Sequence, residues 1–278
     1  MTVARAYLFA HPARHSLSPA MHNAALNALG IPATYEARDV APSDLRATLE
    51  ELRISDAWGA NLSIPHKEHA LEWLDVVSND ARAIGAVNTV VVKDAALHGF
   101  NTDGLGFMRS LEQAGLTSVA GLEVLILGAG GAARGVSYAL KAAGARVTIW
   151  NRTHSRAEQL AAELELEAIG DADLEPRVRA TQLLVNSTAV GLEDAFSSPL
   201  PDGLLPLQGW VCDIVYRPLT TKLLRDAARA ELQTIDGLGM LVHQGALALE
   251  LWLEAQGRSG QPDVAVMRAA ALERLGQP

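Results

Sequence analysis

Glu123-Val-Leu-Ile-Leu-Gly-Ala-Gly-Gly-Ala-Ala-Arg134 is the stretch of sequence that most constrains the fold. An apolar run of strand length enters a glycine-rich turn, and a helix pattern follows it. Gly128, Gly130 and Ala133 match G-x-G-x-x-A, a dinucleotide-binding fingerprint with alanine in its last place. Gly128 permits a tight turn, Gly130 has no Cβ to obstruct a pyrophosphate, and Ala133 lets helix and strand approach closely. The alternative is a plain turn in an alanine-rich chain, but the flanking strand and helix favour a nucleotide site with phosphates at the helix start.

The residues after the next predicted strand, 146–150, indicate which dinucleotide is bound. A site for NAD usually has an acidic residue there to accept a hydrogen bond from the ribose 2′-hydroxyl. Asn151, Arg152 and Thr153 stand there instead, and Arg156 follows about one helical turn later. Arg152 suits the 2′-phosphate of NADP as a charged donor. The sequence therefore favours NADP over NAD. The alternative is that Arg152 is an ordinary solvated arginine that contacts no cofactor.

Length and composition indicate a globular chain of two domains. The chain has 278 residues, of which 49% are hydrophobic and 20% charged, and about 150 residues per domain is typical. The net charge of −9 argues against nucleic acid or an acidic membrane surface as a partner. Cys212 is the single cysteine and has no partner for an internal disulfide. With an N-terminal apolar run too short for a signal peptide or a membrane span, we expect a cytoplasmic protein.

Strand and helix patterns alternate along the chain, which predicts an α/β architecture. The predicted strands cover residues 5–10, 34–39, 59–64, 86–93, 123–127, 146–150, 183–186 and 211–214. The predicted helices cover residues 19–29, 42–52, 67–74, 79–84, 104–114, 132–143, 155–164, 237–255 and 264–275. Ser18 precedes the first helix and is expected to be its N-cap, with Pro19 in the first helical position.

Polar motifs in the first half lie where α/β sheets place ligands. Asn61-Leu-Ser-Ile-Pro-His-Lys67 follows a predicted strand, and Lys67 is the only lysine before Lys93. Asn88 and Thr89 interrupt an apolar stretch, so they need hydrogen-bond partners if they are buried. Each motif also has a structural reading. Lys67 could be a solvated helix-start lysine, and Ser16-Leu-Ser18 and Asn101-Thr-Asp103 could be helix caps.

Taken together, these motifs resemble those of the shikimate dehydrogenases over nearly the whole chain. The matching segments are Ser16-Leu-Ser18, Asn61-Leu-Ser-Ile-Pro-His-Lys67, Gly85-Ala-Val-Asn-Thr89, Asn101-Thr-Asp103, Gly128-Ala-Gly-Gly-Ala-Ala-Arg134, Asn151-Arg-Thr153, Asn186-Ser-Thr-Ala-Val-Gly191, Asp213-Ile-Val-Tyr-Arg-Pro218 and Gly239-Met-Leu-Val-His-Gln244. Each is weak alone, but their common order makes a chance match improbable. The sequence departs from the family pattern at Ser63, usually threonine, at Arg217, usually asparagine, and at Leu192, often methionine.

The resemblance implies NADPH-dependent reduction of 3-dehydroshikimate to shikimate in aromatic amino-acid biosynthesis. It implies a catalytic pair, Lys67 and Asp103, in which Asp103 orients the lysine and the lysine supplies charge and a proton. Whether Lys67 donates the proton or only polarises the carbonyl stays open. The implied substrate-binding residues are Ser16 and Ser18 at the carboxylate, and Asn61, Ser63, Asn88, Tyr216 and Gln244. The implied cofactor-binding residues are Gly128, Ala129, Gly130, Gly131, Ala132, Ala133, Asn151, Arg152, Thr153, Arg156, Thr188, Ile214, Gly237 and Met240.

The resemblance also implies the domain organisation. Residues 1–103 with 238–278 would form a discontinuous substrate-binding domain, and residues 104–237 a Rossmann-like NADP-binding domain, with the site in a cleft between them. We expect shikimate and NADP as ligands, no metal, and a monomer or homodimer. The alternatives are a quinate or dual-specificity dehydrogenase, a silent ligand-binding paralogue that would have lost Lys67 or Asp103, and a metal enzyme. The histidine pairs 11 and 15, and 66 and 69, lack the H-E-x-x-H spacing and a cysteine partner that a metal enzyme would show.

Overall fold

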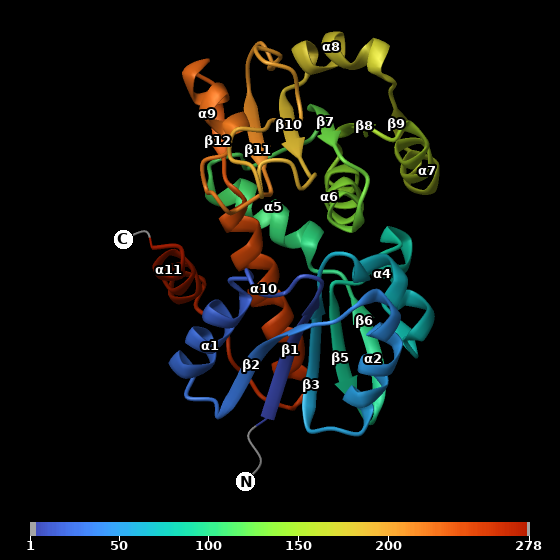
Figure 1. The fold of residues 1–278 in the computed structure, drawn as a ribbon, viewed down its shortest axis with the longest axis vertical. Helices are drawn as coiled ribbons and strands as arrows, with labels where there is room; N and C mark the ends of the chain where they lie inside the picture. The colour runs from blue at the N-terminus through green and yellow to red at the C-terminus, as the bar shows by residue number, and fades with distance from the viewer. Residues whose placement is uncertain (1–3, 277–278) are drawn as a thin grey trace. The chain divides into compact units, whose positions relative to one another are not determined.

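The structure is a computed structural model that describes residues 4–276. Its contacts divide the chain into two compact units (Figure 1). The first contains the residues up to Gly106 together with those from Val242 onward, and the second is Phe107–Leu241. Each unit is built on a six-stranded sheet with helices around it, so the predicted α/β fold class is confirmed. None of the described helices is long and apolar enough to cross a membrane.

The sheet of the first unit is mixed, with strand order β2-β1-β3-β5-β6-β4. Its strands are β1 (Ala4–Ala10), β2 (Ala33–Asp39), β3 (Ala57–Leu62), β4 (Val76–Val77), β5 (Thr89–Lys93) and β6 (Ala96–Phe100). β1 pairs in parallel with both β2 and β3, and the hairpin β5–β6 continues the sheet in antiparallel pairing. β2 is therefore an edge strand, and part of its backbone has no strand partner.

Helices cover both faces of this sheet. Those of the first unit are α1 (Ser18–Ala28), α2 (Leu45–Arg53), α3 (His66–His69), α4 (Asn79–Ile84) and α11 (Val264–Arg274), with two 3₁₀ turns, η1 (Pro42–Asp44) and η2 (Ala70–Trp73). On one face, Leu45, Leu49 and Leu52 of α2 pack with Tyr7 and Phe9 of β1 in a buried cluster. Trp252 belongs to the long helix α10 (Gly237–Ala255) and packs on the opposite face, against Gly59.

The sheet of the second unit is parallel throughout, with strand order β12-β11-β10-β7-β8-β9. Its strands are β7 (Glu123–Leu127), β8 (Arg146–Trp150), β9 (Glu167–Ala168), β10 (Leu183–Asn186), β11 (Trp210–Asp213) and β12 (Gln233–Ile235). Numbered within the unit, this is the order 3-2-1-4-5-6 of a doubly wound dinucleotide-binding sheet. The order reverses between β7 and β10, and ligands of such sheets bind beyond the carboxyl ends of the strands at that point.

Both faces of this second sheet are covered, which explains why its central strands β7, β10 and β11 are largely buried without alternation. The helices of this unit are α6 (Gly131–Ala142), α7 (His154–Leu164), α8 (Asp171–Ala180) and α9 (Lys222–Arg229). α5 (Asp103–Gln113) and α10 carry the chain from one unit to the other and back. Val124 and Ile126 point to the layer of α6, α7 and α5, and Leu125 and Leu127 point to the layer of α8 and α9.

Several elements differ from the sequence-based expectations. Leu17, not Ser18, is the N-cap residue of α1, and Ser18 is its first helical residue. The prediction missed β6, because its hairpin turn is Asp94-Ala95, both at positive φ, without the glycine that usually marks such a turn. It also missed α8, which contains Pro176 in its interior, where proline normally argues against a helix. The short helix α9, capped by the Thr221 side chain, was missed as well.

Candidate active site

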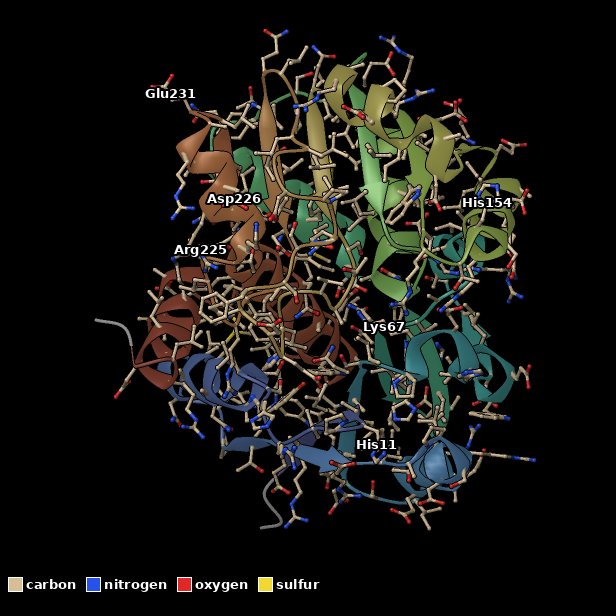
Figure 2. The ribbon with its side chains drawn as sticks, turned by 45° about the horizontal axis from the view of Figure 1, so that its top comes forward. His11, Lys67, His154, Arg225, Asp226 and Glu231 are labelled. Atoms are coloured by element: carbon tan, nitrogen blue, oxygen red, sulfur yellow. The ribbon has the colours of Figure 1, made fainter. Side chains whose placement is uncertain are left out.

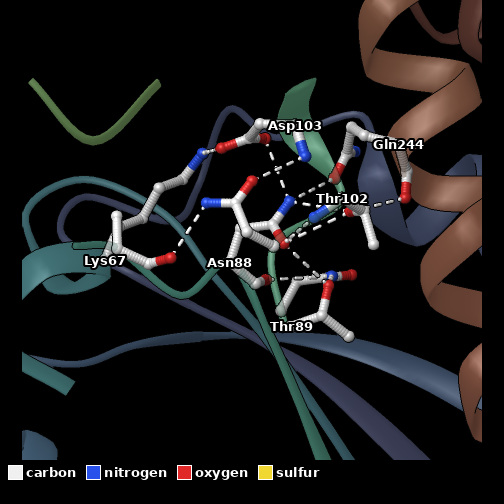
Figure 3. Close-up of polar contacts among 9 residues, drawn as sticks. Lys67, Asn88, Thr89, Thr102, Asp103 and Gln244 are labelled. Atoms are coloured by element: carbon white, nitrogen blue, oxygen red, sulfur yellow. Dashed lines mark hydrogen bonds and ion pairs between the residues drawn. The ribbon is translucent and has the colours of Figure 1, made fainter. Parts of the chain in front are cut away.

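Lys67 and Asp103 form a partly buried ion pair in the first unit. Lys67 Nζ lies 2.6 Å from Asp103 Oδ2, and the two side chains are 15% and 3% exposed (Figure 3). Lys67 lies on α3, directly after β3, and its carbonyl accepts a hydrogen bond from the Val87 backbone at 2.8 Å. Asp103 begins α5, and its backbone N–H donates to Asn101 Oδ1. Two separate chain segments thus hold the ammonium and the carboxylate together.

Asn88 links this pair to the helix α10. Its Nδ2 lies 2.9 Å from Asp103 Oδ1, 2.8 Å from Thr102 Oγ1 and 3.2 Å from Gln244 Oε1 (Figure 3). Its Oδ1 accepts hydrogen bonds from the Thr102 backbone and from the hydroxyls of Thr102 and Thr89. One carboxylate oxygen of Asp103 therefore faces Lys67 and the other faces Asn88, which fixes the carboxylate plane.

Asn61 joins the same network from the end of β3. Its Nδ2 donates to the Asn88 carbonyl and to Thr89 Oγ1, and its Oδ1 accepts from the Tyr35 hydroxyl at 2.8 Å. The expectation that Asn88 and Thr89 need hydrogen-bond partners is confirmed, because both are buried and both are bonded. The residue roles expected from sequence omitted Thr102 and Tyr35. Thr102 lies inside the Asn101-Thr-Asp103 motif, whereas nothing local marks Tyr35.

The three serines expected at the substrate lie outside this network. Ser16 Oγ accepts a hydrogen bond from the Ser18 backbone at 3.1 Å, at the start of α1. Ser18 is buried and Ser16 is half-buried. Ser63 is half-buried, two residues beyond Asn61, and its backbone bonds the Phe9 carbonyl. The geometry thus joins Lys67, Asp103, Asn88, Asn61 and Gln244, and it places the serines on neighbouring segments of the same unit.

The glycine-rich turn of the second unit has the shape expected of a phosphate-binding loop. Gly128 has φ +116°, and a Cβ there would lie 2.9 Å from the Ser187 carbonyl oxygen. Gly130 precedes the first turn of α6, and no atom lies within 4 Å of where its Cβ would be. Ala133 is fully buried between α6 and the sheet. The open space at the helix start and its N–H groups fit a pyrophosphate.

The segment after β8 presents charged side chains at the surface. Arg152, Thr153 and Arg156 are exposed, and Asn151 Nδ2 donates to the Thr153 carbonyl across the loop. His154, the first residue of α7, also has its side chain at the surface, 3.4 Å from Glu158 (Figure 2). Because no acidic residue occupies this loop, it suits a phosphate better than a ribose hydroxyl.

A buried carboxylate, Asp213, organises the two loops that follow β10 and β11. Its oxygens accept hydrogen bonds from Asn186 Nδ2, the Val215 backbone and the Thr221 hydroxyl. Asn186 Oδ1 in turn accepts from the backbone and hydroxyl of Thr188. Burial raises the pKa of Asp213 to about 6, although its three hydrogen bonds act in the opposite direction. The residue roles expected from sequence included neither Asn186 nor Asp213.

The remaining residues expected at the cofactor lie around the same strand ends. The Ile214 backbone donates to the Asn186 carbonyl. Gly237 begins α10, and a Cβ there would lie 2.2 Å from the Ile214 carbonyl oxygen. Met240 is buried in the core of this unit, and Tyr216 is half-buried in the loop after β11.

Two of the histidines considered as possible metal ligands make hydrogen-bond contacts within the protein. His11 Nδ1 lies 2.5 Å from Asp39, and the buried His66 uses Nε2 to contact the Val40 carbonyl. Within residues 4–276, no group of three or more histidine, cysteine or acidic side chains is placed to hold a metal ion.

A doubly wound sheet with an open glycine turn at its switch point, in one chain with a partly buried lysine–carboxylate pair, defines a dehydrogenase that uses a dinucleotide. Family models match both units: the shikimate dehydrogenase substrate binding domain at residues 8–90, and shikimate / quinate 5-dehydrogenase at residues 110–192. The chain belongs to the shikimate dehydrogenase family. The family expected from the sequence motifs is thereby confirmed.

Individual relatives match over almost their whole length. The shikimate dehydrogenase (NADP(+)) of Symbiobacterium thermophilum is 49% identical over 98% of this chain and 95% of its own. The crystal structure of Thermus thermophilus shikimate 5-dehydrogenase in complex with NADP(H) and shikimate has a TM-score of 0.90 at 46% identity, covering 98% of this chain and 99% of that one. Quinate dehydrogenase from Corynebacterium glutamicum in complex with NAD has a TM-score of 0.87 at 30% identity, covering 97% and 99%.

Proposed function

We propose that this protein catalyses the reversible, NADPH-dependent reduction of 3-dehydroshikimate to shikimate, a step of chorismate and aromatic amino-acid biosynthesis. The observation that carries the proposal is the partly buried contact of 2.6 Å between Lys67 Nζ and Asp103 Oδ2. Reduction of a ketone produces negative charge on the carbonyl oxygen, and a preorganised ammonium stabilises that charge. A relative that is 49% identical to this chain is a shikimate dehydrogenase (NADP(+)).

In this mechanism NADPH supplies the hydride, and the protein manages charge and one proton. Lys67 would face the carbonyl oxygen of the substrate and stabilise the developing alkoxide. The alkoxide becomes the hydroxyl of shikimate by taking up one proton, from Lys67 itself or from solvent. Asp103 accepts a hydrogen bond from Lys67, which orients the ammonium. Asn88 holds the other oxygen of Asp103, so the carboxylate cannot turn away from the lysine.

Amide and hydroxyl side chains of the first unit are suited to hydrogen-bond the polyhydroxylated substrate. We assign the substrate hydroxyls to Asn61, Asn88, Asp103 and Gln244, which form one hydrogen-bond network with Lys67. We assign the substrate carboxylate to Ser16 and Ser18 at the start of α1. We also assign Ser63 and Tyr216 to substrate binding, and Tyr216 would contact the nicotinamide as well.

We assign NADP to the carboxyl end of the parallel sheet in the second unit. The turn at residues 128–133 would hold the pyrophosphate, because it combines open space with a helix N-terminus. Asn151, Arg152, Thr153 and Arg156 would hold the 2′-phosphate. Thr188, Ile214, Gly237 and Met240 would line the cofactor farther along the sheet edge. The first unit is then the substrate-binding domain and the second the NADP-binding domain.

The setting we propose is cytoplasmic, with a monomer or homodimer and with no nucleic-acid or membrane partner. The buried, unpaired thiol of Cys212 and the net charge of −9 support this setting.

A steady-state assay of shikimate and quinate, each with NADP and with NAD, tests the proposal. We expect the highest kcat/KM for shikimate with NADP. A higher kcat/KM for quinate would support a quinate dehydrogenase, and a preference for NAD would contradict the assignment of Arg152. The absence of turnover with all four combinations would overturn the proposed function.

A further inference from the structure

The side-chain amide of Asn61 has a fixed direction. Nδ2 lies 3.2 Å from the Asn88 carbonyl oxygen and 3.1 Å from Thr89 Oγ1. Because a backbone carbonyl only accepts hydrogen bonds, the NH₂ end of the amide must face Asn88 and Oδ1 must face away from it. Both amide hydrogens are therefore used within the protein. Toward a substrate, Asn61 offers only the acceptor capacity of Oδ1.

Tyr35 on β2 donates a hydrogen bond to Asn61 Oδ1 on β3, although β1 lies between the two strands. Its hydroxyl lies 2.8 Å from Asn61 Oδ1, and both side chains are buried. Since Oδ1 accepts, the Tyr35 hydroxyl must donate. The residues in register with Tyr35 on β1 and β3 are Ala6 and Gly59. Neither has a bulky side chain, so the tyrosine ring can lie across β1 toward Asn61.

Two residues of helix α1 contact Tyr35, one at its backbone and one at its ring. Asn23 donates to the Tyr35 carbonyl at 2.9 Å and accepts from its N–H at 2.8 Å, which replaces the missing neighbour of the edge strand β2. His22 stacks on the Tyr35 ring with centroids 4.1 Å apart and 9° between the planes. Trp252 of α10 contacts both rings at a tilt and is itself fixed by a hydrogen bond to the Val90 carbonyl.

The environment of His22 explains why this histidine acts as an aromatic ring. It is fully buried, and neither ring nitrogen has a hydrogen-bond partner among residues 4–276. Burial lowers its pKa to about 3, so the imidazole is neutral at physiological pH. A neutral ring can stack on Tyr35 without placing an unpaired charge beside the polar network.

We propose that Tyr35 is a positioning residue for substrate recognition, which holds Asn61 Oδ1 in the direction from which it accepts a hydrogen bond from a hydroxyl group of the ring substrate. The inference rests on the proposed function, in which Asn61 contacts the substrate. Without the Tyr35 hydroxyl, Oδ1 would be a buried acceptor that has lost its donor, and the amide would be free to rotate. The catalytic pair Lys67 and Asp103 makes no bond to Tyr35 or Asn61 in the network above. Loss of the Tyr35 hydroxyl should therefore weaken substrate binding and leave the chemical step unchanged.

Tyr35→Phe tests this inference because it removes only the hydroxyl. Binding of shikimate without cofactor, and of NADP without substrate, would be measured by titration. We expect the Kd of shikimate to rise about three- to tenfold, the loss of one neutral hydrogen bond, while the Kd of NADP and kcat stay within about twofold. Tyr7→Phe is the matched control. Tyr7 is a buried tyrosine of the same sheet, on the opposite face, with its ring beneath Arg38, and its substitution should leave the Kd of shikimate unchanged.

A double-mutant cycle shows whether Tyr35 acts through Asn61. In an Asn61→Ala background, Tyr35→Phe should weaken shikimate binding no further, because the group it positions is gone. An unchanged Kd in Tyr35→Phe, an equal effect of Tyr7→Phe, or additive effects in the cycle would overturn the inference. If Tyr35→Phe does not stay folded, His22→Leu takes its place, because it removes the ring stacked on Tyr35. This variant should raise the Kd of shikimate but not that of NADP. An unchanged Kd of shikimate would overturn the inference. Failure of the wild type to bind shikimate would instead count against the proposed function.

Discussion

Gly128 and Ser187 lie so close together that a Cβ on Gly128 would be 2.9 Å from the Ser187 carbonyl oxygen. The two residues directly follow the strands β7 and β10, which are neighbours where the strand order of the second sheet reverses. Gly128 also has φ +116°, which side-chain-bearing residues rarely adopt. The first glycine of the fingerprint is therefore required both by the backbone and by the spacing of the two loops.

Gly128→Ala should weaken NADP binding at least about tenfold, because steric strain of a few kcal/mol would displace the turn. The Kd of shikimate should not change, since Gly128 lies in the other unit. Titration with each ligand separately checks both expectations. Gly115→Ala is the matched control: Gly115 has φ +100°, but no atom lies within 4 Å of its Cβ position. Equal losses of NADP binding in the two variants would show that backbone strain alone is responsible.

Arg152→Ala should raise the KM of NADP about 10- to 100-fold, the loss of one charge-assisted contact. The KM of NAD should hardly move, because NAD has no 2′-phosphate for the guanidinium to hold. Steady-state kinetics with both cofactors measures the difference. Arg229→Ala is the control, since Arg229 is 77% exposed on α9 in the same unit. A parallel rise in both KM values would mean that Arg152 does not recognise the 2′-phosphate.

Asp213 should make the stability of the protein depend on pH. Its pKa is about 6 in the folded state against an ordinary value of 3.8, so between these values the folded protein holds a proton that the unfolded chain has lost. Its stabilising contribution is complete below the unfolded pKa and is lost as the pH rises through 6. The loss amounts to about 3 kcal/mol in all, of which about 1 kcal/mol falls between pH 5 and pH 7.

Asp213→Asn cannot titrate and keeps the shape of the side chain, so it isolates this effect. Urea unfolding of the wild type and the variant at pH 5 and pH 7 gives the four free energies of unfolding. The wild type should lose about 1 kcal/mol of unfolding free energy relative to the variant on going from pH 5 to pH 7. Other carboxylates cancel in this difference. A difference that does not change with pH would show that the folded-state pKa of Asp213 is close to its ordinary value.

The sequence predicted the four central strands of the second sheet, β7, β8, β10 and β11, because each is a largely apolar run followed by a turn, but it missed the short outer strands β9 and β12. Gly128, Gly130 and Ala133 mark the β7–α6 turn without any tertiary information. Elements without such signals were missed. The β5–β6 hairpin turns at Asp94-Ala95 instead of at a glycine, and α8 contains Pro176. In both cases tertiary packing overrides the local preference.

The candidate site was predictable to the extent that its residues occur in motifs. Lys67, Asn88 and Asp103 belong to separate short segments, and the fold brings them into one hydrogen-bond network. Tyr35 and Asp213 are not in these motif roles: Tyr35 donates a hydrogen bond to Asn61, and Asp213 accepts one from Asn186. A contact across strands or between two loops leaves no spacing in the sequence, so such supporting residues become visible only in the structure.

The most direct test of the account is kcat for shikimate oxidation with NADP in the wild type and in Lys67→Ala. Because the Lys67 ammonium matters most as charge develops on the reacting oxygen, kcat should fall about 10²–10⁴-fold while the KM of shikimate changes much less. Lys93→Ala, which removes an exposed lysine at the end of β5 in the same unit, should leave kcat unchanged. If Lys67→Ala keeps more than about half of the wild-type kcat, the catalytic assignment of the Lys67–Asp103 pair is contradicted.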